Sequence, residues 1–555
     1  MAVFEKKVHR KVYLDDTQVL KCMFENAQNI QGHTEYVIRV QRGPGPEKCW
    51  RVCKRYNDFV CLHNALQASG LALPLPPKRL IGNMDREFVA ERRISLENYI
   101  NCILMNPILA SSLPVKKFLD PDNYSTPFHE LALQHVSMAL RSEMNYEVVR
   151  PVPDMGWRLR KHHFLVRDRS RPAQELLLSW VEHGPDKYLD DKDLQAAFKA
   201  LRHLQHPFIQ TIELLSCNEV GGFVARRLSV AGSVRDVLCC TTPKLPFLKK
   251  YGNPRQHRPF PAPELALLGS QILQALGFLH DKGLPFGHLH TGNIAVESGR
   301  VKLLDVENGV LGLPSYYRPY FVQHKKIQTL EAIDVYSFGH VLFEMAFGRP
   351  LHESVCDDIP AGCPSMLDSV LEAVLSSKAC RSGMPTVAAL LAHPFFRSQD
   401  TAPERPQFKL APLTRDALRG AWQRTEARLH EEQRMVRQQK RLVKVQQLLS
   451  SEDEMKKRKQ KLRQEQKERH LQLQQQDAQM NGTSPERSDS PNSTSTATSA
   501  GTVTPPAGLA SVLLPPSPPP PPPPAPVSGS SPGRDALLGS ICSFDKASLR
   551  PTAGH

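Results

Sequence analysis

The spacing of apolar and polar residues divides the chain into segments with different expected structures. Residues 14–125 alternate between strand-like and helical spacing, which predicts one α+β domain. Residues 127–398 continue with strands and then longer apolar helices, which predicts a larger α/β region. In the first segment, DREFVAERRISLENYINCIL predicts an amphipathic helix whose apolar side holds Phe88, Leu96, Tyr99 and Ile103.

The last part of the chain is polar and predicts little core. Residues 407–478 are rich in Lys, Arg, Glu and Gln and predict a long basic helix. Apolar residues stand seven apart at Met435, Leu442 and Leu449, which leaves a single charged helix and a coiled coil both open. Residues 479–533 are rich in Ser, Thr and Pro and predict a disordered linker.

Composition and charge support several domains and an acidic partner. A chain of 555 residues exceeds one core, and its 47 prolines indicate disordered segments. The net charge of +15 is uneven, because residues 415–469 hold 17 Lys and Arg against 9 Asp and Glu, a net +8. This segment favours anionic lipid, nucleic acid or an acidic protein surface, and a solvated charged helix explains it equally well.

The chain carries no visible targeting segment. No apolar run reaches the ~18 residues that span a bilayer, and the start MAVFEKKVHR lacks the apolar region of a signal peptide. The twelve cysteines are scattered without zinc-site spacing. We therefore expect a cytoplasmic protein with free thiols.

Four residues of the first segment suggest an anion site. Arg55 and Tyr56 precede an amphipathic helix, Lys78 ends a proline-rich loop, and Arg92 lies near the start of the next helix. Cations on a strand end, a rigid loop and a helix can converge on one ligand, and arginine offers a phosphate two donors. Tyr56 adds an apolar face for a sugar ring. The alternative is that these are ordinary surface cations and that the domain binds protein.

The order of RYNDF, PLPPK and ERR in this segment resembles the PX (phox-homology) domain family. The resemblance implies a three-stranded sheet packed on helices that binds phosphatidylinositol 3-phosphate at membranes. It implies that Arg55 binds the 3-phosphate, Tyr56 the inositol face and Lys78 the 1-phosphate. Arg92 would bind the ring hydroxyls, and its neighbour Arg93 is the alternative if the register differs by one residue.

The second segment resembles the protein kinase fold along most of its length. The stretches FKALRHLQHPFIQTIEL, LGFLHDKGLPFGHLHTGNIAV, VKLLDVENG and EAIDVYSFGHVLFEMAFGRPL follow one another in the kinase order. The resemblance implies a bilobal α/β domain in which Asn293 and Asp305 occupy the metal-binding positions. It also implies that Asp334 is a structural acid of the central helix.

The catalytic positions of that fold are altered. His288 stands at the position of the proton-accepting aspartate, and His290 at that of the lysine that neutralises the transferred phosphoryl group. The phosphate-loop candidate has one glycine, Gly156, followed by bulky Trp157 and Arg158, although a backbone that approaches phosphates closely favours glycine.

The kinase lysine–glutamate pair is also missing. The strand ELLLSWVEH has no lysine in reach, with Trp180 expected at that position, and the glutamate position falls on Ala197. Glu307 replaces the glycine that follows the metal-binding aspartate. Asn293 and Asp305 remain, either to bind metal or only to hydrogen-bond the loop.

Each part of a kinase site is worth orders of magnitude in rate, so several losses predict a pseudokinase. The alternative is an atypical active Ser/Thr protein kinase, recruited to membranes, that uses a lysine from elsewhere. No cofactor is required for the first reading, and binding of ATP and Mg²⁺ stays possible in both.

The end of the chain, residues 534–551, predicts a short amphipathic helix followed by an extended stretch. This pattern resembles the WH2 actin-monomer-binding motif, and a generic tail helix is the alternative. The candidate actin-binding residues are Leu537, Leu538, Ile541, Leu549 and Arg550. The preceding run Pro518–Pro524 is able to bind profilin or SH3 domains as polyproline II.

The order of these parts resembles the family of PX-domain-containing, serine/threonine-kinase-like proteins. The resemblance implies a multidomain adaptor, peripheral on endosomal or plasma membrane, that binds phosphatidylinositol 3-phosphate and actin. Its kinase-like domain would dock proteins, with a role in the trafficking or modulation of membrane receptors or transporters. No nucleic-acid partner is expected.

Overall fold

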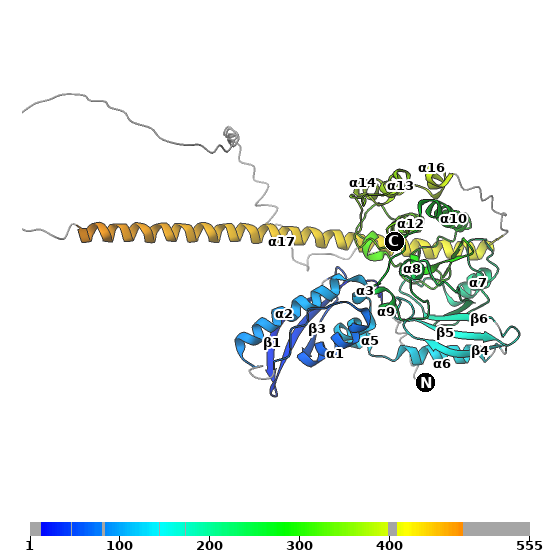
Figure 1. Cartoon of the computed structure of the whole chain (residues 1–555), viewed down its shortest axis with the longest axis horizontal. Coiled ribbons are helices and arrows are strands. Elements are labelled where there is room, and N and C mark those ends of the chain that lie inside the picture. The colour runs from blue at the N-terminus through cyan, green and yellow to red at the C-terminus, as the bar shows by residue number, and fades with distance from the viewer. Residues whose placement is uncertain are drawn as a thin grey trace, which may run out of the picture. The chain divides into compact units, whose positions relative to one another are not determined.

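The computed structural model describes residues 13–469, with gaps at 46, 80–83, 142, 144, 173 and 398–407, and the backbone of one helix to residue 480 (Figure 1). The chain separates into two compact units, Met1–Arg463 and Gln464–His555. Apart from the end of that helix, the linker 479–533 lies outside the described residues. The predicted tail motif lies outside them entirely, as do Leu537, Leu538, Ile541, Leu549 and Arg550.

The first domain is a three-stranded antiparallel sheet packed on helices, as predicted. Side chains that alternate along the strands meet the apolar side of the helices, with Ile38, Phe59 and Leu96 fully buried in one core. Its strands are β1 (Leu20–Ile30), β2 (His33–Arg42) and β3 (Cys49–Arg55). Its helices are α1 (Tyr56–Leu66), η1 (Gln67–Ser69), α2 (Arg86–Met105), α3 (Pro107–Ala110), α4 (Leu113–Leu119) and α5 (Pro121–Tyr124).

The second domain begins with a small lobe, a five-stranded antiparallel sheet in the order β4-β5-β6-β8-β7. Helix α6 packs on one face of this sheet and α7 on the side of the main core. The strands are β4 (Tyr146–Val152), β5 (Lys161–Asp168), β6 (Glu175–Glu182), β7 (Leu214–Cys217) and β8 (Gly221–Arg227). The helices are α6 (Phe128–Leu140) and α7 (Asp191–Leu201).

The expectation that Trp180 occupies the kinase lysine position is wrong. Its indole stacks on His135 of α6 at 4.9 Å between ring centroids, on the face turned away from the other lobe. Leu177 and Ser179 of the same strand line the cleft between the lobes. Successive side chains of a strand point to opposite faces, so Trp180 is excluded from the cleft.

The large lobe is mainly helical and is built around α10 (Ala262–Asp281) and α12 (Leu330–Phe347), with a hairpin of β9 (Ile294–Glu297) and β10 (Arg300–Leu303). Asp334 of α12 is fully buried and accepts hydrogen bonds from the backbone N–H groups of Phe286 and Gly287 at 2.8 and 2.6 Å. The remaining elements are α8 (Val234–Leu238), α9 (Phe247–Tyr251), η2 (Thr291–Asn293), α11 (Arg318–Phe321), α13 (Ser365–Leu375), α14 (Ser377–Ser382), α15 (Val387–Leu391) and α16 (Pro394–Arg397).

Helix α10 is long and apolar enough to span a membrane by length and composition alone. Its Leu268, Ile272 and Leu276 are fully buried in the core of the large lobe. Burial in that core therefore accounts for its composition.

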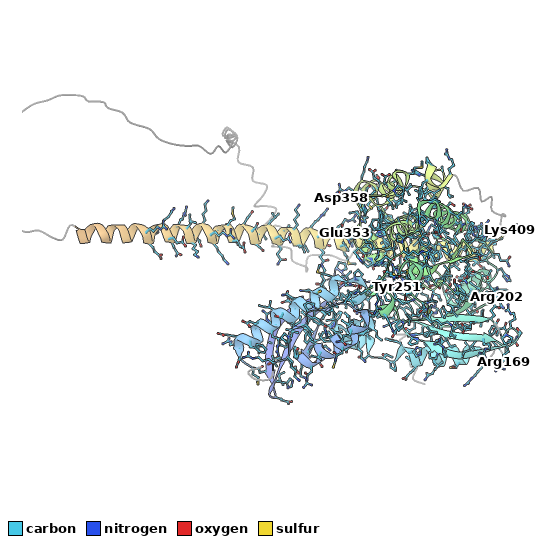
Figure 2. All side chains as sticks on the ribbon, in the orientation of Figure 1. Arg169, Arg202, Tyr251, Glu353, Asp358 and Lys409 are labelled. Atoms are coloured by element: carbon cyan, nitrogen blue, oxygen red, sulfur yellow. The ribbon has the colours of Figure 1, made fainter. Side chains whose placement is uncertain are left out.

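The predicted basic helix is α17 (Pro412–Met480), and its first third belongs to the kinase-like core. Leu418, Ala421 and Leu429 are buried in the same cluster as α10 and α12. All side chains from residue 441 to 469 are exposed, and those of the outer stretch stand out from the helix in Figure 2. The predicted boundary at residue 398 therefore cuts through one folded body.

Candidate functional site

The lipid-site candidates Tyr56 and Arg92 lie in direct contact. The Arg92 guanidinium stacks 4.5 Å from the centre of the Tyr56 ring and 4.2 Å from that of Phe88, and its Nη2 donates to the carbonyl of Pro77 at 3.1 Å. The Tyr56 hydroxyl donates to the carbonyl of Pro76. Both side chains therefore fix the proline-rich loop that ends at Lys78, and Arg92 itself is buried, with 7% of its surface exposed.

The other two candidates are solvent-exposed. Arg55 is the N-terminal capping residue of α1, and its backbone N–H donates to the carboxylate of Asp58 at 2.7 Å. The residue is exposed to solvent. Lys78 is exposed at the end of the loop. Arg93 is used differently, because its Nη1 donates to the carbonyl of Phe24 in β1 at 2.9 Å. Of the two arginines, Arg92 therefore contacts the proline-rich loop and Arg93 contacts β1.

In the kinase-like cleft, the two catalytic-loop histidines contact the two bulky residues of the phosphate-loop candidate. Nη2 of Arg158 lies 3.3 Å from Nδ1 of His288 and donates to the carbonyl of Pro314 at 2.8 Å. The indole Nε1 of Trp157 lies 3.3 Å from Nε2 of His290. These two contacts join the small lobe to the large lobe.

Both histidine rings are held neutral. Burial lowers the pKa of His288 well below its ordinary value, and the Arg158 charge lowers it further. The pKa of His290 is lowered by burial and then by the charges of Arg235 and Arg158. Nδ1 of His290 also faces the backbone N–H of Gly292 at 3.1 Å, so the neutral ring accepts either that proton or the indole proton of Trp157.

Asp305, the metal-binding candidate, is paired with cations. Its Oδ2 lies 2.8 Å from Nζ of Lys161, and its Oδ1 lies 3.6 Å from Nη1 of Arg226. Burial would raise the pKa of this carboxyl, but the charges of Lys161 and Arg226, together with the hydrogen bond from Lys161, outweigh it and hold the pKa below the usual range. Glu307 is fully buried, forms an ion pair with Arg226 and lies 3.8 Å from Lys161. The four residues form a closed ionic cluster.

Asn293 is engaged by the backbone of its own loop. Its Oδ1 accepts from the N–H of His290 at 3.0 Å, and its Nδ2 donates to the carbonyl of His288. Ala197 is buried inside α7, where kinases place the partner of the lysine. The one lysine of the described cleft wall that reaches Asp305 comes instead from β5.

Local sequence patterns do not indicate that Lys161 and Arg226 line the cleft. Lys161 pairs across the sheet with Val181, so it enters the cleft from the strand beside the expected one. The described residues contain no group of three or more His, Cys, Asp or Glu side chains arranged to hold a metal ion.

Comparison with known proteins supports a PX domain followed by a kinase-like domain. The PX domain family matches residues 44–122. A Rattus norvegicus protein called PX domain-containing protein kinase-like protein is 48% identical over 447 residues, 80% of this chain and 77% of its own length. A PX domain implies phosphoinositide binding and peripheral association with membranes.

Two more distant relatives cover less of the chain. The Drosophila melanogaster Slowpoke-binding protein is 30% identical over 218 residues, 37% of this chain and 41% of its own length. A Dictyostelium discoideum protein named probable inactive serine/threonine-protein kinase slob1 is 27% identical over 293 residues, 47% of this chain and 49% of its own length. With its PX fold, its kinase-like lobes and its coverage of the rat protein, this chain belongs to the family of PX domain-containing protein kinase-like proteins.

Proposed function

We propose that the protein is a membrane adaptor whose PX domain binds phosphatidylinositol 3-phosphate and whose kinase-like domain docks proteins without transferring phosphate. The observation that carries the second half is the contact between Arg158 and His288. A general base must accept a proton near the working pH, and a buried imidazole beside a guanidinium disfavours the protonated form.

The lipid half is supported by the arrangement around Tyr56. Arg92 is oriented by Tyr56 and Phe88, while Arg55 and Lys78 are exposed near the ends of the strand and the loop. A preorganised arginine loses little freedom when it binds a ring hydroxyl or phosphate, and the exposed cations add charge attraction to an anionic surface.

The lipid proposal is tested by flotation of the full-length protein with vesicles that contain phosphatidylinositol 3-phosphate. Arg55→Ala should reduce binding at least tenfold, whereas Arg51→Ala, which removes the same charge from the same strand, should change it less than twofold. Arg51 is paired with Glu25 and serves as the matched control. Equal loss in both variants would indicate only general charge attraction and would contradict a headgroup site.

The absence of phosphoryl transfer is tested with labelled ATP and general protein substrates. No transfer above that of a Lys161→Met, Asp305→Asn double variant is expected. Transfer by the natural protein that disappears in the double variant would contradict this half of the proposal.

A second candidate, an atypical membrane-recruited Ser/Thr kinase, has one specific observation in its favour. Lys161 belongs to β5, the strand beside the one expected to carry the kinase lysine, and its Nζ lies 2.8 Å from Asp305. In an active kinase of this kind, Lys161 would take the role of the missing lysine. Transfer abolished by Asp305→Asn alone would support it.

The finer parts of the adaptor role are also proposals. Residues 534–551 would bind actin through a WH2 motif, and Pro518–Pro524 would bind profilin or SH3 domains. Location on endosomal or plasma membrane, and a role in the trafficking of receptors or transporters, follow from the same reading. Actin-monomer binding lost in Leu538→Asp but kept in Leu513→Asp would support the motif, and equal binding by both variants would contradict it.

A further inference from the structure

The kinase fold implies Mg²⁺ beside Asp305, but the residues present do not fit that ion. Magnesium requires oxygen ligands in near-octahedral geometry and is bound through carboxylates that are free to coordinate. Both oxygens of Asp305 face cations, Lys161 at 2.8 Å and Arg226 at 3.6 Å. The amide of Asn293 is spent on the loop backbone. A metal ion would have to displace two cations and break one loop contact.

The cleft nevertheless has positive charge to offer an anion. Among the described residues Arg158 forms no salt bridge, and its burial lowers its pKa to about 10, which leaves it charged at neutral pH. Arg226 is 6% exposed, and its Nε has no hydrogen-bond partner among the residues the structure describes. Both side chains line the same cavity as Lys161.

The other pairs in this wall are internally neutral. Lys250 lies 3.0 Å from Asp236, and Arg235 lies 2.8 Å from Glu344. After these pairs and the Lys161–Arg226–Asp305–Glu307 cluster are counted, the half-buried Arg158 remains without a carboxylate at salt-bridge distance among the described residues. A partly desolvated cation without an ion-pair partner attracts an anionic ligand.

The same cavity has an apolar wall that suits a planar ring. Leu177 from β6, Ala295 from β9 and Leu304 after β10 line it from both lobes. An aromatic ring placed between such side chains buries apolar area, while its attached phosphates would extend toward the cations.

We propose that the cleft binds a nucleoside polyphosphate without a divalent metal, with Arg158 supplying surplus positive charge and with Lys161 and Arg226 of the ionic cluster supplying further hydrogen-bond donors, in the place that magnesium takes in an active kinase. Because magnesium neutralises the phosphates that these cations contact, it should weaken binding rather than support it. This inference rests on the proposed function, in which the kinase-like domain does not transfer phosphate, and it adds a nucleotide ligand to that domain.

The test is a thermal shift and direct titration of the full-length protein with ATP, with excess EDTA or with excess Mg²⁺. The expected result is stabilisation in EDTA and an affinity at least threefold lower with Mg²⁺. Asp305→Asn should keep or increase the affinity in EDTA, because it frees Lys161 for the ligand. Arg158→Ala should lower it at least tenfold, and Lys244→Ala, which removes a cation outside this cavity, should leave it unchanged.

If Lys161→Met loses ATP binding in EDTA, then Lys161→Arg, which keeps the charge, should retain that binding. Should Lys161→Met fail to fold, the Arg158→Ala result decides alone. Stabilisation that requires Mg²⁺ and is lost in Asp305→Asn would overturn the inference, as would no ATP binding in either condition. Lack of binding leaves the adaptor proposal standing, whereas measured phosphoryl transfer would contradict that proposal itself.

Discussion

Nη2 of Arg158 lies 3.3 Å from Nδ1 of His288, so the small-lobe segment that follows Gly156 contacts the large-lobe loop that precedes Asn293. The neighbouring pair repeats the pattern, because Trp157 lies against His290 with 6.2 Å between ring centroids. Two side-chain contacts between the same two segments therefore join the small lobe to the large lobe.

Arg158→Met should destabilise the protein by about 1–3 kcal/mol, since it removes charge-assisted hydrogen bonds to a carbonyl and a ring nitrogen. The free energy of unfolding is measured by urea denaturation. A double-mutant cycle with His288→Ala should give a coupling of at least about 0.5 kcal/mol. Arg160→Met, which removes the neighbouring arginine and its 3.7 Å ion pair with Glu182, should show no coupling to His288. Additive effects of Arg158→Met and His288→Ala would contradict the contact.

His288→Asp should not restore phosphoryl transfer. The new carboxylate would lie against Arg158, which would hold it as an ion pair instead of leaving it free to accept a proton. The measurement is transfer from labelled ATP, with the natural protein as the baseline. A rate increase of more than tenfold in this single variant would mean that the rest of the site is competent.

Arg92→Lys should weaken binding to vesicles with phosphatidylinositol 3-phosphate about tenfold, because lysine has neither the planar fork nor the stacking surface that Tyr56 and Phe88 contact. Flotation or surface plasmon resonance measures the change. Arg86 is exposed at the start of α2 and serves as the control position. The Arg86→Lys variant keeps the charge, so its affinity for the vesicles should stay within about twofold of that of the natural protein. Equal weakening in both would argue against a specific role for Arg92.

Acid should destabilise the kinase-like domain because several of its histidines are buried in the neutral form. Burial lowers the pKa of His340 to about 3 and that of His206 to about 4. The unfolded chain binds these protons near pH 6.5, so the stabilisation is complete above that pH and is lost as the pH falls through it toward the folded values. Unfolding free energy should drop by about 1 kcal/mol per such histidine between about pH 7 and pH 5.5.

His340→Phe provides the matched variant for the acid effect. Neither ring nitrogen of His340 has a hydrogen-bond partner among the described residues, and the ring stacks on Tyr317 at 4.5 Å. Phenylalanine keeps the stacking and removes the titration, so the unfolding temperature should fall less steeply with acid. A pH dependence parallel to that of the natural protein would exclude His340 as a contributor.

Arg428→Met should destabilise the protein by about 3–5 kcal/mol, the cost of leaving buried charges without their partner. Arg428 of α17 forms ion pairs with Asp15, with Asp186 at 2.8 Å and with Glu432 at 3.1 Å. Arg434→Met breaks an exposed pair six residues further on and should cost less than about 1 kcal/mol. Thermal unfolding measures both, and similar values for the two variants would contradict a structural role for the buried cluster.

Much of the fold and part of the site follow from local sequence patterns. The alternation in β1–β3 and the apolar side of α2 are readable because each element has one buried face. Lys161 is not readable in this way, since its role depends on the register between β5 and β6 and on which face of the sheet it enters.

The burial of the start of α17 is not readable from the sequence for a different reason. Its charged composition suggests a free helix, yet Leu418, Ala421 and Leu429 follow helical spacing and are buried. The buried cations and acids near them, such as Arg428 and Glu432, compensate one another only after folding. Amino-acid composition does not show which charges form buried pairs, so it predicts a solvent-exposed helix.

The burial of the first third of α17 also sets the order of events during synthesis. Leu418 and Leu429 belong to a hydrophobic core whose first residue in the chain is Val181. Part of the apolar core of the large lobe therefore stays exposed until these late residues leave the ribosome. Domains otherwise tend to fold as soon as they emerge, and exposed apolar surface favours aggregation. The nascent kinase-like domain should therefore depend on chaperones for longer than the PX domain, whose fully buried core residues end at Leu119.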